Sequence, residues 1–488
     1  MAADPRSLDP HMEVSVGTTL ITLNTYNNLL RFNPEMTGWE LELAESVKQI
    51  NATTYLFKIH KGVRFHDIPP VNGRELTSAD VKYSIERVAG QYGKRTDFKH
   101  RWYFENKIKS METPDKYTLI IKTVEPNAAF LRHLSSPWCA IVPKEAVDQF
   151  GDLKNQAIGT GPFMIKECVK GSHIALIKNP NYWKKGLPYL DGIHFKIMPD
   201  PSSILSAFIA DRLDGSAVYH HQIETIIQKA PQTLIEQLPG THMWVLRVQP
   251  WIEGTKPLKP PFDNPKVRQA LTMAIDKKKL LHLAWGGNGK IGVGVIPPVL
   301  EDSLKETDQV KYDPKKAKQL LTEAGYPNGF SIELLTWTSE YMKIPAQILK
   351  EMLKEVGIEV KMIFLEQAQY LNRAYRFDYH LALHITTAGV DPEDWLVPYF
   401  GPVDESTVYK WSNPEIWKLV KEQSKIMDVK KRKAMIRTIQ QKLMEDAPFV
   451  CLFTQTRFSV RKPYVHVLKR YKLDYQPLYG EYFWMEKH

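Results

Sequence analysis

Segments typical of helices and strands alternate through residues 313–385, and this alternation limits the possible folds more than any other feature. The segment YDPKKAKQLLTEAGYPNGF predicts a helix that begins after Asp313 and stops at Gly325. A strand (SIELLTW) and a helix (IPAQILKEMLKEVG) follow, and then IEVKMIFL and YHLALHI predict two more strands. Strands separated by helices predict a largely parallel sheet with both faces covered.

Capping residues and apolar spacing predict further elements on both sides of this region. Residues 262–284 predict helix, because Asn264 is a favourable N-cap and Pro265 suits the first turn. Thr77 and Asp80 fit a capping box at the start of a helix over residues 77–88. Two more helices are predicted over residues 412–428 and through residues 436–443. The segment FVCLFTQTRFSV (449–460) predicts a strand that returns the chain to an earlier domain.

Composition limits the classes of protein to which this chain can belong. Its 488 residues exceed one hydrophobic core and predict roughly three domains. The apolar content is ordinary for a globular protein, and no run of apolar residues is long enough to predict a transmembrane helix. The net charge of +10 is spread along the chain, so no nucleic-acid partner is predicted. Cys139, Cys168 and Cys451 lack a metal-binding spacing, and neither a metal nor a cofactor is predicted.

The loop TTAGVDPEDW (386–395) concentrates side chains that could act on or bind a ligand. It follows the predicted strand at 379–385, and open α/β sheets bind ligands at the carboxyl ends of their strands. The carboxylates of Asp391, Glu393 and Asp394 suit an acid–base pair, the grip on a ligand, or a solvated turn. The spacing alone does not choose among these three. The sequence has no HExxH or GxSxG motif and no dinucleotide-binding fingerprint.

Several sequence blocks occur in an order that resembles one protein family. They are ADPRSLDPH (3–11), LAESVKQINATTYLFKIHKGVRFHD, LTSADVKYSIERV, GTGPFMI, NPNYWKKGLPYLDGIHFKIMPDPSS (179–203), FDNPKVRQALTMAID, YDPKKAKQLLTEAGYPNGF and WSNPEIWKLV. Each block is weakly specific, but the ordered set spans nearly the whole chain. It is similar to the family 5 extracellular solute-binding proteins, which are the dipeptide, oligopeptide and nickel-type receptors of bacterial ABC importers.

The resemblance implies a fold and a location. The implied fold is an α/β clamshell of periplasmic-binding-protein type II, with two lobes and an inserted subdomain. Lobe I would comprise residues 1–32, 158–255 and 452–488, the inserted subdomain residues 33–157, and lobe II residues 256–451. The segment MAADPRSLDPH has neither the basic n-region nor the apolar h-region of a signal peptide. A periplasmic or extracytoplasmic location is therefore implied by the resemblance alone.

The resemblance also implies a binding site at the loop. In the family's peptide receptors, an Asp three residues before the acidic-Pro pair holds the α-amino group of the peptide. Alignment on Asp391-Pro392 places Ala388 at that position. A charge-assisted hydrogen bond contributes roughly 1.5–3 kcal/mol, so its loss should weaken peptide recognition unless Asp391 takes over the role.

The predicted site combines backbone, charge and aromatic surface. The backbone of residues 384–389 would pair with an extended ligand, residues 14–17 would face it from the other lobe, and Asp391 would be the charged anchor. Three tryptophans would form the walls of the cleft. The predicted ligand-binding residues are Val14, Ser15, Val16, Gly17, Trp337, His384, Thr386, Thr387, Ala388, Gly389, Asp391, Trp395 and Trp411.

Three functional hypotheses follow. In the first, a monomeric receptor captures a peptide or peptide-like solute between its lobes and delivers it to a membrane permease, without catalysis. The second keeps this role but changes the cargo to a sugar, an opine-like compound or a metal chelate, because Ala388 removes the amine anchor. The third and remote hypothesis is a carboxylate-dependent hydrolase.

Overall fold

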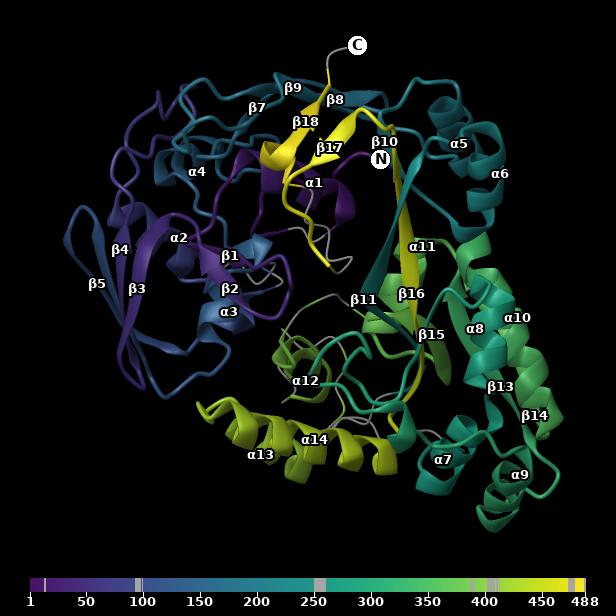
Figure 1. Ribbon diagram of the computed structural model, residues 1–488. Helices are drawn as coiled ribbons and strands as arrows, with labels where there is room; N and C mark the ends of the chain where they lie inside the picture. Colours follow the sequence, from purple (N-terminus) through teal and green to yellow (C-terminus); the bar gives the residue numbers. More distant parts are fainter. Residues whose placement is uncertain are drawn as a thin grey trace. The chain divides into compact units, whose positions relative to one another are not determined.

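The computed structural model divides the chain into two compact units. The first contains residues 1–237 and 458–488, and the second contains residues 238–457. Both boundaries fall inside strands, β11 (Leu234–Val248) and β16 (Phe449–Arg461), which are neighbours in one sheet (Figure 1). The structure describes residues 1–12, 15–92, 98, 100–249, 260–386, 389, 391–401, 409, 411, 413–472 and 479–486.

The first unit contains small antiparallel sheets and short helices. Its described helices are α1 (Val16–Thr25), α2 (Ser78–Val88), α3 (Phe130–Leu134), α4 (Lys144–Phe150), α5 (Pro201–Ile209) and α6 (Ile223–Lys229). One sheet has the order β3 (Ala44–Asn51), β4 (Thr54–Ile59), β6 (Thr118–Thr123), β5 (Ile108–Asp115), and another has the order β7 (Phe163–Val169), β8 (His173–Lys178), β9 (Gly192–Lys196). Two strand pairs are β1 (Leu30–Phe32) with β2 (Trp39–Leu41), and β17 (Val465–Val467) with β18 (Phe483–Met485).

The second unit is built on a larger mixed sheet, to which the first unit contributes β10, the first residues of β11 and the last residues of β16. The described strands have the order β10 (Gly215–Val218), β16, β11, β15 (Leu381–Ile385), β13 (Phe330–Trp337), β14 (Ile358–Leu365), and β12 (Gly289–Ile291) pairs with β16. The described helices are α7 (Pro265–Ala274), α8 (Lys277–Trp285), α9 (Pro314–Glu323), α10 (Glu340–Glu355), α11 (Gln367–Tyr375), α12 (Glu393–Phe400), α13 (Pro414–Gln423) and α14 (Val429–Asp446).

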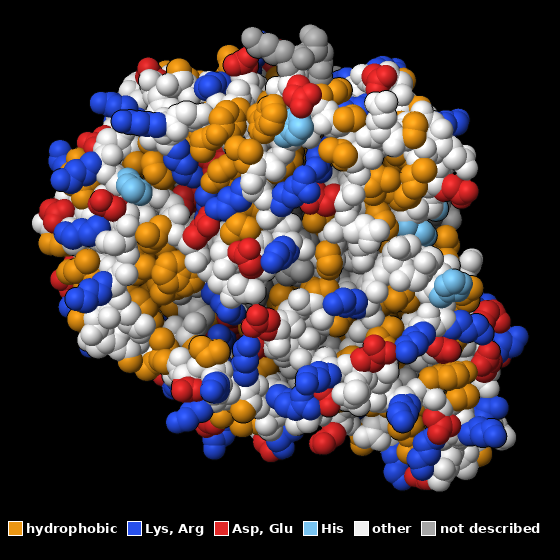
Figure 2. Space-filling view, in the orientation of Figure 1, with side chains coloured by type: hydrophobic (Ala, Val, Ile, Leu, Met, Phe, Trp, Pro, Cys, Tyr) orange, Lys and Arg blue, Asp and Glu red, His pale blue; other side chains and the backbone are white. Residues whose placement is uncertain are grey.

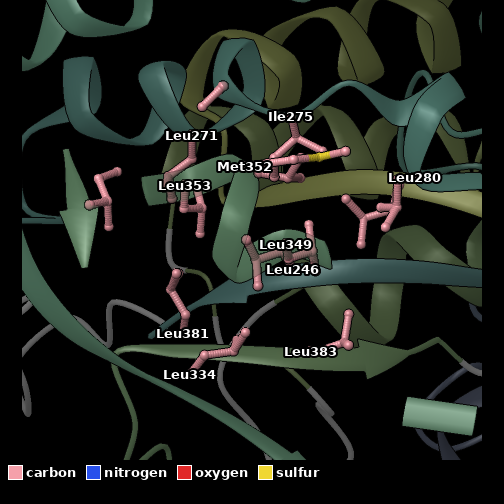
Figure 3. Packing of buried hydrophobic residues seen from close by; sticks show 14 of the residues in the cluster. Leu246, Leu271, Ile275, Leu280, Leu334, Leu349, Met352, Leu353, Leu381 and Leu383 are labelled. Carbon is pink, nitrogen blue, oxygen red and sulfur yellow. The ribbon is translucent and has the colours of Figure 1, made fainter. Parts of the chain in front are cut away.

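One face of this sheet carries the main apolar core of the second unit. Leu246 of β11, Leu334 of β13 and Leu383 of β15 lie on that face and are fully buried. Leu271 of α7 and Leu349 of α10 pack against them (Figure 3). Because side chains alternate across a strand, the residues next to these leucines point to the opposite face of the sheet.

The capping signals in the sequence lie at the predicted helix starts. Thr77 and Asp80 form the capping box of α2, and the side chains of Asn264 and Asp313 cap α7 and α9. The segment 262–284, however, contains two helices. The chain turns extended at Ile275, and the side chain of Asp276 accepts a hydrogen bond from Lys279 N–H to begin α8. Asp276 is therefore a second N-cap, and it splits the single predicted helix into two, although Ile275 between them is buried like the apolar residues of both helices.

The prediction of a largely parallel sheet holds for only part of it. Strand β13 pairs in parallel with β14 and with β15, as helical crossovers between strands allow. The pairs β11–β15, β10–β16 and β12–β16 are antiparallel. The predicted return of the 449–460 strand is confirmed, because β16 starts in the second unit and pairs with β10 of the first.

The three-part division of the chain stays a prediction. The second unit begins and ends close to the predicted lobe II, but its limits lie within β11 and β16 rather than at residues 256 and 451. An unbroken strand has no linker-like composition, so the sequence carries no signal at the boundary. Within the described residues, residues 33–157 are grouped with the rest of the first unit.

On the face seen in Figure 2, charged side chains are dispersed. Lys and Arg side chains alternate with Asp and Glu across this face. Within the part of the chain that the structure describes, no helix has the length and hydropathy needed to span a bilayer.

Candidate functional site

The turn after β15 is held by an ion pair between Asp391 and Arg432 of α14. Arg432 Nη2 donates to Asp391 Oδ1 at 2.7 Å, and Nη1 donates to Oδ2 at 3.1 Å. Asp391 is fully buried. Burial alone would lower the pKa of Arg432, but the Asp391 carboxylate beside it raises that pKa above its usual value. Both carboxylate oxygens of the predicted charged anchor therefore contact a cation of the protein itself.

The neighbouring acids also serve this turn. Asp394 Oδ2 accepts a hydrogen bond from Asp391 N–H at 3.1 Å, and Asp391 Oδ1 accepts one from Glu393 N–H at 3.0 Å. Glu393 lies 3.7 Å from Arg432 and accepts a hydrogen bond from the Gln423 amide at 3.3 Å. All three acids are buried. The loop is therefore a buried acidic turn that begins α12, rather than an exposed pair of acids.

Gly389 lies against this turn. A Cβ atom at residue 389 would lie 2.3 Å from the Cβ and Oδ2 atoms of Asp394. Such contacts are too short for any other residue without a shift of the turn. Glycine at this position therefore allows the backbone to approach Asp394 closely.

Thr386 and Trp395 link the start of the loop to the sheet. Thr386 N–H donates to the Met243 carbonyl at 2.8 Å, and Thr386 Oγ1 accepts from Met243 N–H at 3.1 Å. The indole Nε1 of Trp395 donates to Thr386 Oγ1 at 3.3 Å. Trp395 is 1% exposed, so its ring is part of the packing behind the loop rather than an open wall.

Trp337 and His384 meet at the end of β15. They lie on one sheet face with Tyr370 of α11, which makes ring contacts with both. The hydroxyl of Tyr370 is hydrogen-bonded to His384 Nδ1 at 2.7 Å. Burial, reinforced by the positive charge of Arg247, holds the pKa of His384 well below its usual value, so the imidazole is neutral at neutral pH.

Strand β15 lies between β11 and β13 in the sheet. The register of β13 with β15 covers only Leu381 and Ala382. Strand β11 pairs with β15 as far as Ile385. Within the described residues, the β13–β15 register does not extend to residues 383–385, and the Leu383 carbonyl accepts a hydrogen bond from the Tyr370 hydroxyl at 3.1 Å.

Trp411 packs beside the end of α14. Its indole Nε1 donates to Asp446 Oδ2 at 2.6 Å, and the guanidinium of Arg268 lies 5.1 Å from its ring centre. Trp411 is buried and stacks on Tyr409. These contacts give it a packing role beside the end of α14.

Ser15, Val16 and Gly17 begin helix α1 of the first unit. The Ser15 side chain caps this helix by accepting a hydrogen bond from Thr18 N–H. The predicted site residues that lie outside the described part of the chain are Val14, Thr387 and Ala388. Within the described part, no group of three or more His, Cys, Asp or Glu side chains is placed to hold a metal ion.

Two residues that the sequence analysis did not select belong to the cluster at β15. They are Tyr370 and Arg247, and Arg247 is 1% exposed. Arg247 interrupts the apolar strand segment MWVLRV, and a cation in such a segment is the signal that could have identified it. Tyr370 carries no comparable signal, because its position in α11 is that of an ordinary core aromatic residue.

Comparison with known proteins places this geometry among solute receptors. The family model "Bacterial extracellular solute-binding proteins, family 5 Middle" matches residues 38–407. The glutathione-binding protein GsiB of Pectobacterium atrosepticum is 27% identical over 473 residues, which cover 93% of this chain and 87% of that protein.

Two solved structures resemble the whole chain. The periplasmic binding protein DppA of Helicobacter pylori, in complex with the peptide STSA, has a TM-score of 0.85 and 26% identity, with 100% of this chain and 97% of that chain covered. The PBP AgaA of A. tumefaciens R10, in complex with agropinic acid, has a TM-score of 0.85 and 25% identity, with 100% and 98% covered. The expected fold class, an α/β periplasmic-binding-protein fold of type II, is confirmed.

Proposed function

Because the chain belongs to the bacterial extracellular solute-binding proteins of family 5, we propose that it is an ABC-importer receptor for a peptide or peptide-like solute. The solute binds between the two lobes, their closure buries it, and the closed form delivers it to a membrane permease. Closure requires that the solute bind the closed form more tightly than the open form. The receptor acts as a monomer outside the cytoplasm.

The observation that supports the peptide cargo is the position of the segment 384–389 at the carboxyl end of β15, beyond the short register of β15 with β13 at Leu381 and Ala382. An extended peptide placed there would continue the sheet beyond Ala382, with main-chain hydrogen bonds supplying affinity. His384 and Trp337 lie beside this strand end and would contact alternate side chains of the peptide. The peptide complex of the similar H. pylori protein supports the same cargo class.

In this proposal, several other predicted site residues belong to the loop at residues 386–395 or hold it in place. We propose that the backbone groups of Thr386, Thr387, Ala388 and Gly389 contact the ligand, and that Val14, Ser15, Val16 and Gly17 are further ligand-binding residues. Asp391 positions the turn through Arg432, and Trp395 does so through Thr386. Trp411 supports the end of α14. The carboxylates are committed to these contacts, and the family is one of binding proteins, so no hydrolase is proposed.

A second cargo class is favoured by a specific observation. Ala388 stands where a peptide receptor of the family would hold an Asp, and the similar AgaA structure contains agropinic acid. An opine-like compound, a sugar or a metal chelate is therefore the alternative cargo for the same receptor role.

Native mass spectrometry of the purified protein tests the cargo directly. We expect a bound species with the mass of a short peptide, which is released when the protein is unfolded. Adding the same peptide back to the refolded protein should raise its melting temperature, with about 2.7 kcal/mol of stabilisation at 100 times the dissociation constant. A bound species whose fragments contain no amino acids would overturn the peptide cargo in favour of the alternative class.

A further inference from the structure

Arg247 of β11 is a buried cation on the sheet face that also carries His384. It is 1% exposed and lies opposite Ala382 in the β11–β15 register. Its neighbours in sequence, Leu246 and Val248, belong to the apolar core on the other face. The side chain of Arg247 therefore lies on the sheet face that carries the smaller apolar cluster of Ala382, Tyr370 and Tyr379, and not on the face of the main core.

The groups around the guanidinium are neutral phenols. Its Cζ atom lies 5.7 Å from the ring centre of Tyr409, and Tyr370 and Tyr379 are among its electrostatic neighbours. Burial raises the pKa of Tyr379 to about 12, although Arg247 acts to lower it. Burial also raises the pKa values of Tyr370 and Tyr409. At neutral pH none of these three hydroxyls supplies a negative charge.

The polar atoms of this cluster have unused hydrogen-bonding capacity. Arg247 Nε and Nη2 are buried, and within the described part of the chain they have no hydrogen-bond partner. The same is true of the Tyr379 hydroxyl and of Gln249 Oε1, two residues further along β11. Nor does any described carboxylate lie within 4.0 Å of the Arg247 nitrogens to form an ion pair.

Other buried arginines of the second unit differ in this respect. Arg432 pairs with Asp391 at 2.7 Å, and Arg268 pairs with Asp446 at 2.7 Å. Buried charges in proteins are normally paired, because an isolated charge loses its hydration without compensation. Arg247 thus has the features of a cation whose partner is supplied from outside the chain.

We propose that Arg247 and Tyr379 form an anion-binding site that takes a carboxylate group of the solute. A guanidinium presents parallel N–H donors that match the two oxygens of a carboxylate, and the Tyr379 hydroxyl supplies a third donor. Arg247 lies opposite Ala382 in the β11–β15 register, two residues before His384, so the site adjoins the strand end at which the solute backbone is placed. The inference rests on the proposed receptor function and narrows its cargo to solutes with a carboxylate.

The test compares full-length protein with the variants Arg247→Met and Tyr379→Phe, each freed of bound ligand by unfolding and refolding. Arg437→Met is the matched control, because it removes the same charge from an exposed pair with Asp308 on the same unit. The probes are the tetrapeptide STSA with a free carboxyl terminus, STSA with an amidated terminus, and sodium acetate. Binding is read by calorimetry and by the shift in melting temperature.

We expect the free-acid peptide to bind the unmodified protein and Arg437→Met about tenfold or more tightly than the amide. This preference should vanish in Arg247→Met and weaken in Tyr379→Phe. Without ligand, Arg247→Met should melt no lower than the unmodified protein, because it removes an uncompensated buried charge. A lower melting temperature combined with an unchanged preference for the free acid would assign Arg247 a structural role and overturn the site.

The measurement with acetate distinguishes failure of the proposed peptide cargo from failure of the proposed anion site. If neither peptide binds the unmodified protein, STSA fails as cargo, and acetate alone then tests the anion site. Stabilisation by acetate of the unmodified protein and Arg437→Met, but not of Arg247→Met, would support the site with a free small carboxylate as its source. An equal response of all three proteins to acetate and to both peptides would overturn it.

Discussion

At the scale of single residues, the pair between Asp391 and Arg432 fixes the turn that follows β15. Asp391→Asn leaves the Arg432 guanidinium buried without its counter-charge, which typically costs about 3–5 kcal/mol. We expect a matching fall in the free energy of unfolding of the second unit, measured by urea denaturation.

The exposed pair between Lys433 and Glu301 is the control for this substitution. Glu301→Gln should change the free energy of unfolding by less than about 1 kcal/mol, because solvent screens exposed ion pairs. The same two variants address the predicted anchor role of Asp391. A tenfold loss of affinity for a cationic solute in Asp391→Asn, with unchanged stability, would favour direct contact with the ligand over positioning.

Asp9 makes the first unit sensitive to acid. It is fully buried, and both of its carboxylate oxygens accept hydrogen bonds from Arg87, at 2.9 and 2.5 Å. Burial alone would raise its pKa, but Arg87 lowers it to about 2. Since the unfolded carboxyl binds protons more readily, the pair stabilises the fold above about pH 4 and this contribution, on the order of 2 kcal/mol, is lost towards about pH 2.

The variant Asp9→Asn isolates this contribution. The stability difference between the unmodified protein and the variant should shrink as the pH falls from about 4 to about 2, as measured by urea denaturation at each pH. A difference that stays constant across this range would show that Asp9 is not the titrating group.

At the scale of an element, the turn between β15 and α12 depends on the close approach of Gly389 to Asp394. Gly389→Ala would place a methyl group within 2.3 Å of the Asp394 side chain. We expect a loss of about 1–3 kcal/mol, typical of overpacking, together with weaker solute binding. Urea denaturation and calorimetry measure the two effects.

Gly38 provides the comparison. A methyl group there would have its nearest neighbour, in the Asn33 side chain, at 3.6 Å, which is an ordinary contact. Gly38→Ala should therefore leave both solute binding and stability nearly unchanged. Equal effects of the two substitutions would mean that the turn after β15 yields easily, and that its geometry does not control solute binding.

At the scale of the whole molecule, Glu481 joins the C-terminal segment to the start of the first unit. It is 1% exposed and accepts hydrogen bonds from Arg31 at 2.7 Å, Lys184 at 2.9 Å and Tyr182 at 2.5 Å. Glu481→Gln should cost about 1.5–3 kcal/mol, because buried Arg31 and half-buried Lys184 lose one charge-assisted partner but keep Glu42 nearby. Hydrogen exchange should accelerate in peptides around residues 30–42 and 479–486, but not in β13–β15.

The exposed pair between Glu486 and His466 gives the matched control in the same segment. Glu486→Gln should leave the exchange of the first unit unchanged. If Glu481→Gln also left it unchanged, the C-terminal segment would be tied down by the pairing of β17 with β18 and not by the buried acid.

The sequence alone determined those features that depend on local chemistry. Local sequence patterns predicted the helix caps at Thr77, Asn264 and Asp313. They also predicted the alternation of strands and helices and the family blocks, because each of these depends on residues close together in the chain. The same alternation predicts that a ligand binds at the end of β15, and this stays a prediction.

Only the tertiary structure decided what the side chains at that place do. Asp391 was expected to meet a ligand, yet its partner is Arg432 on a helix 41 residues later, and no local pattern encodes that contact. In the same way, the proposed role of Arg247 depends on tyrosines from distant parts of the chain, which surround its guanidinium but do not neutralise its charge. Ion pairs and burial depend on residues distant in the chain, so they become visible only when the fold brings those residues together.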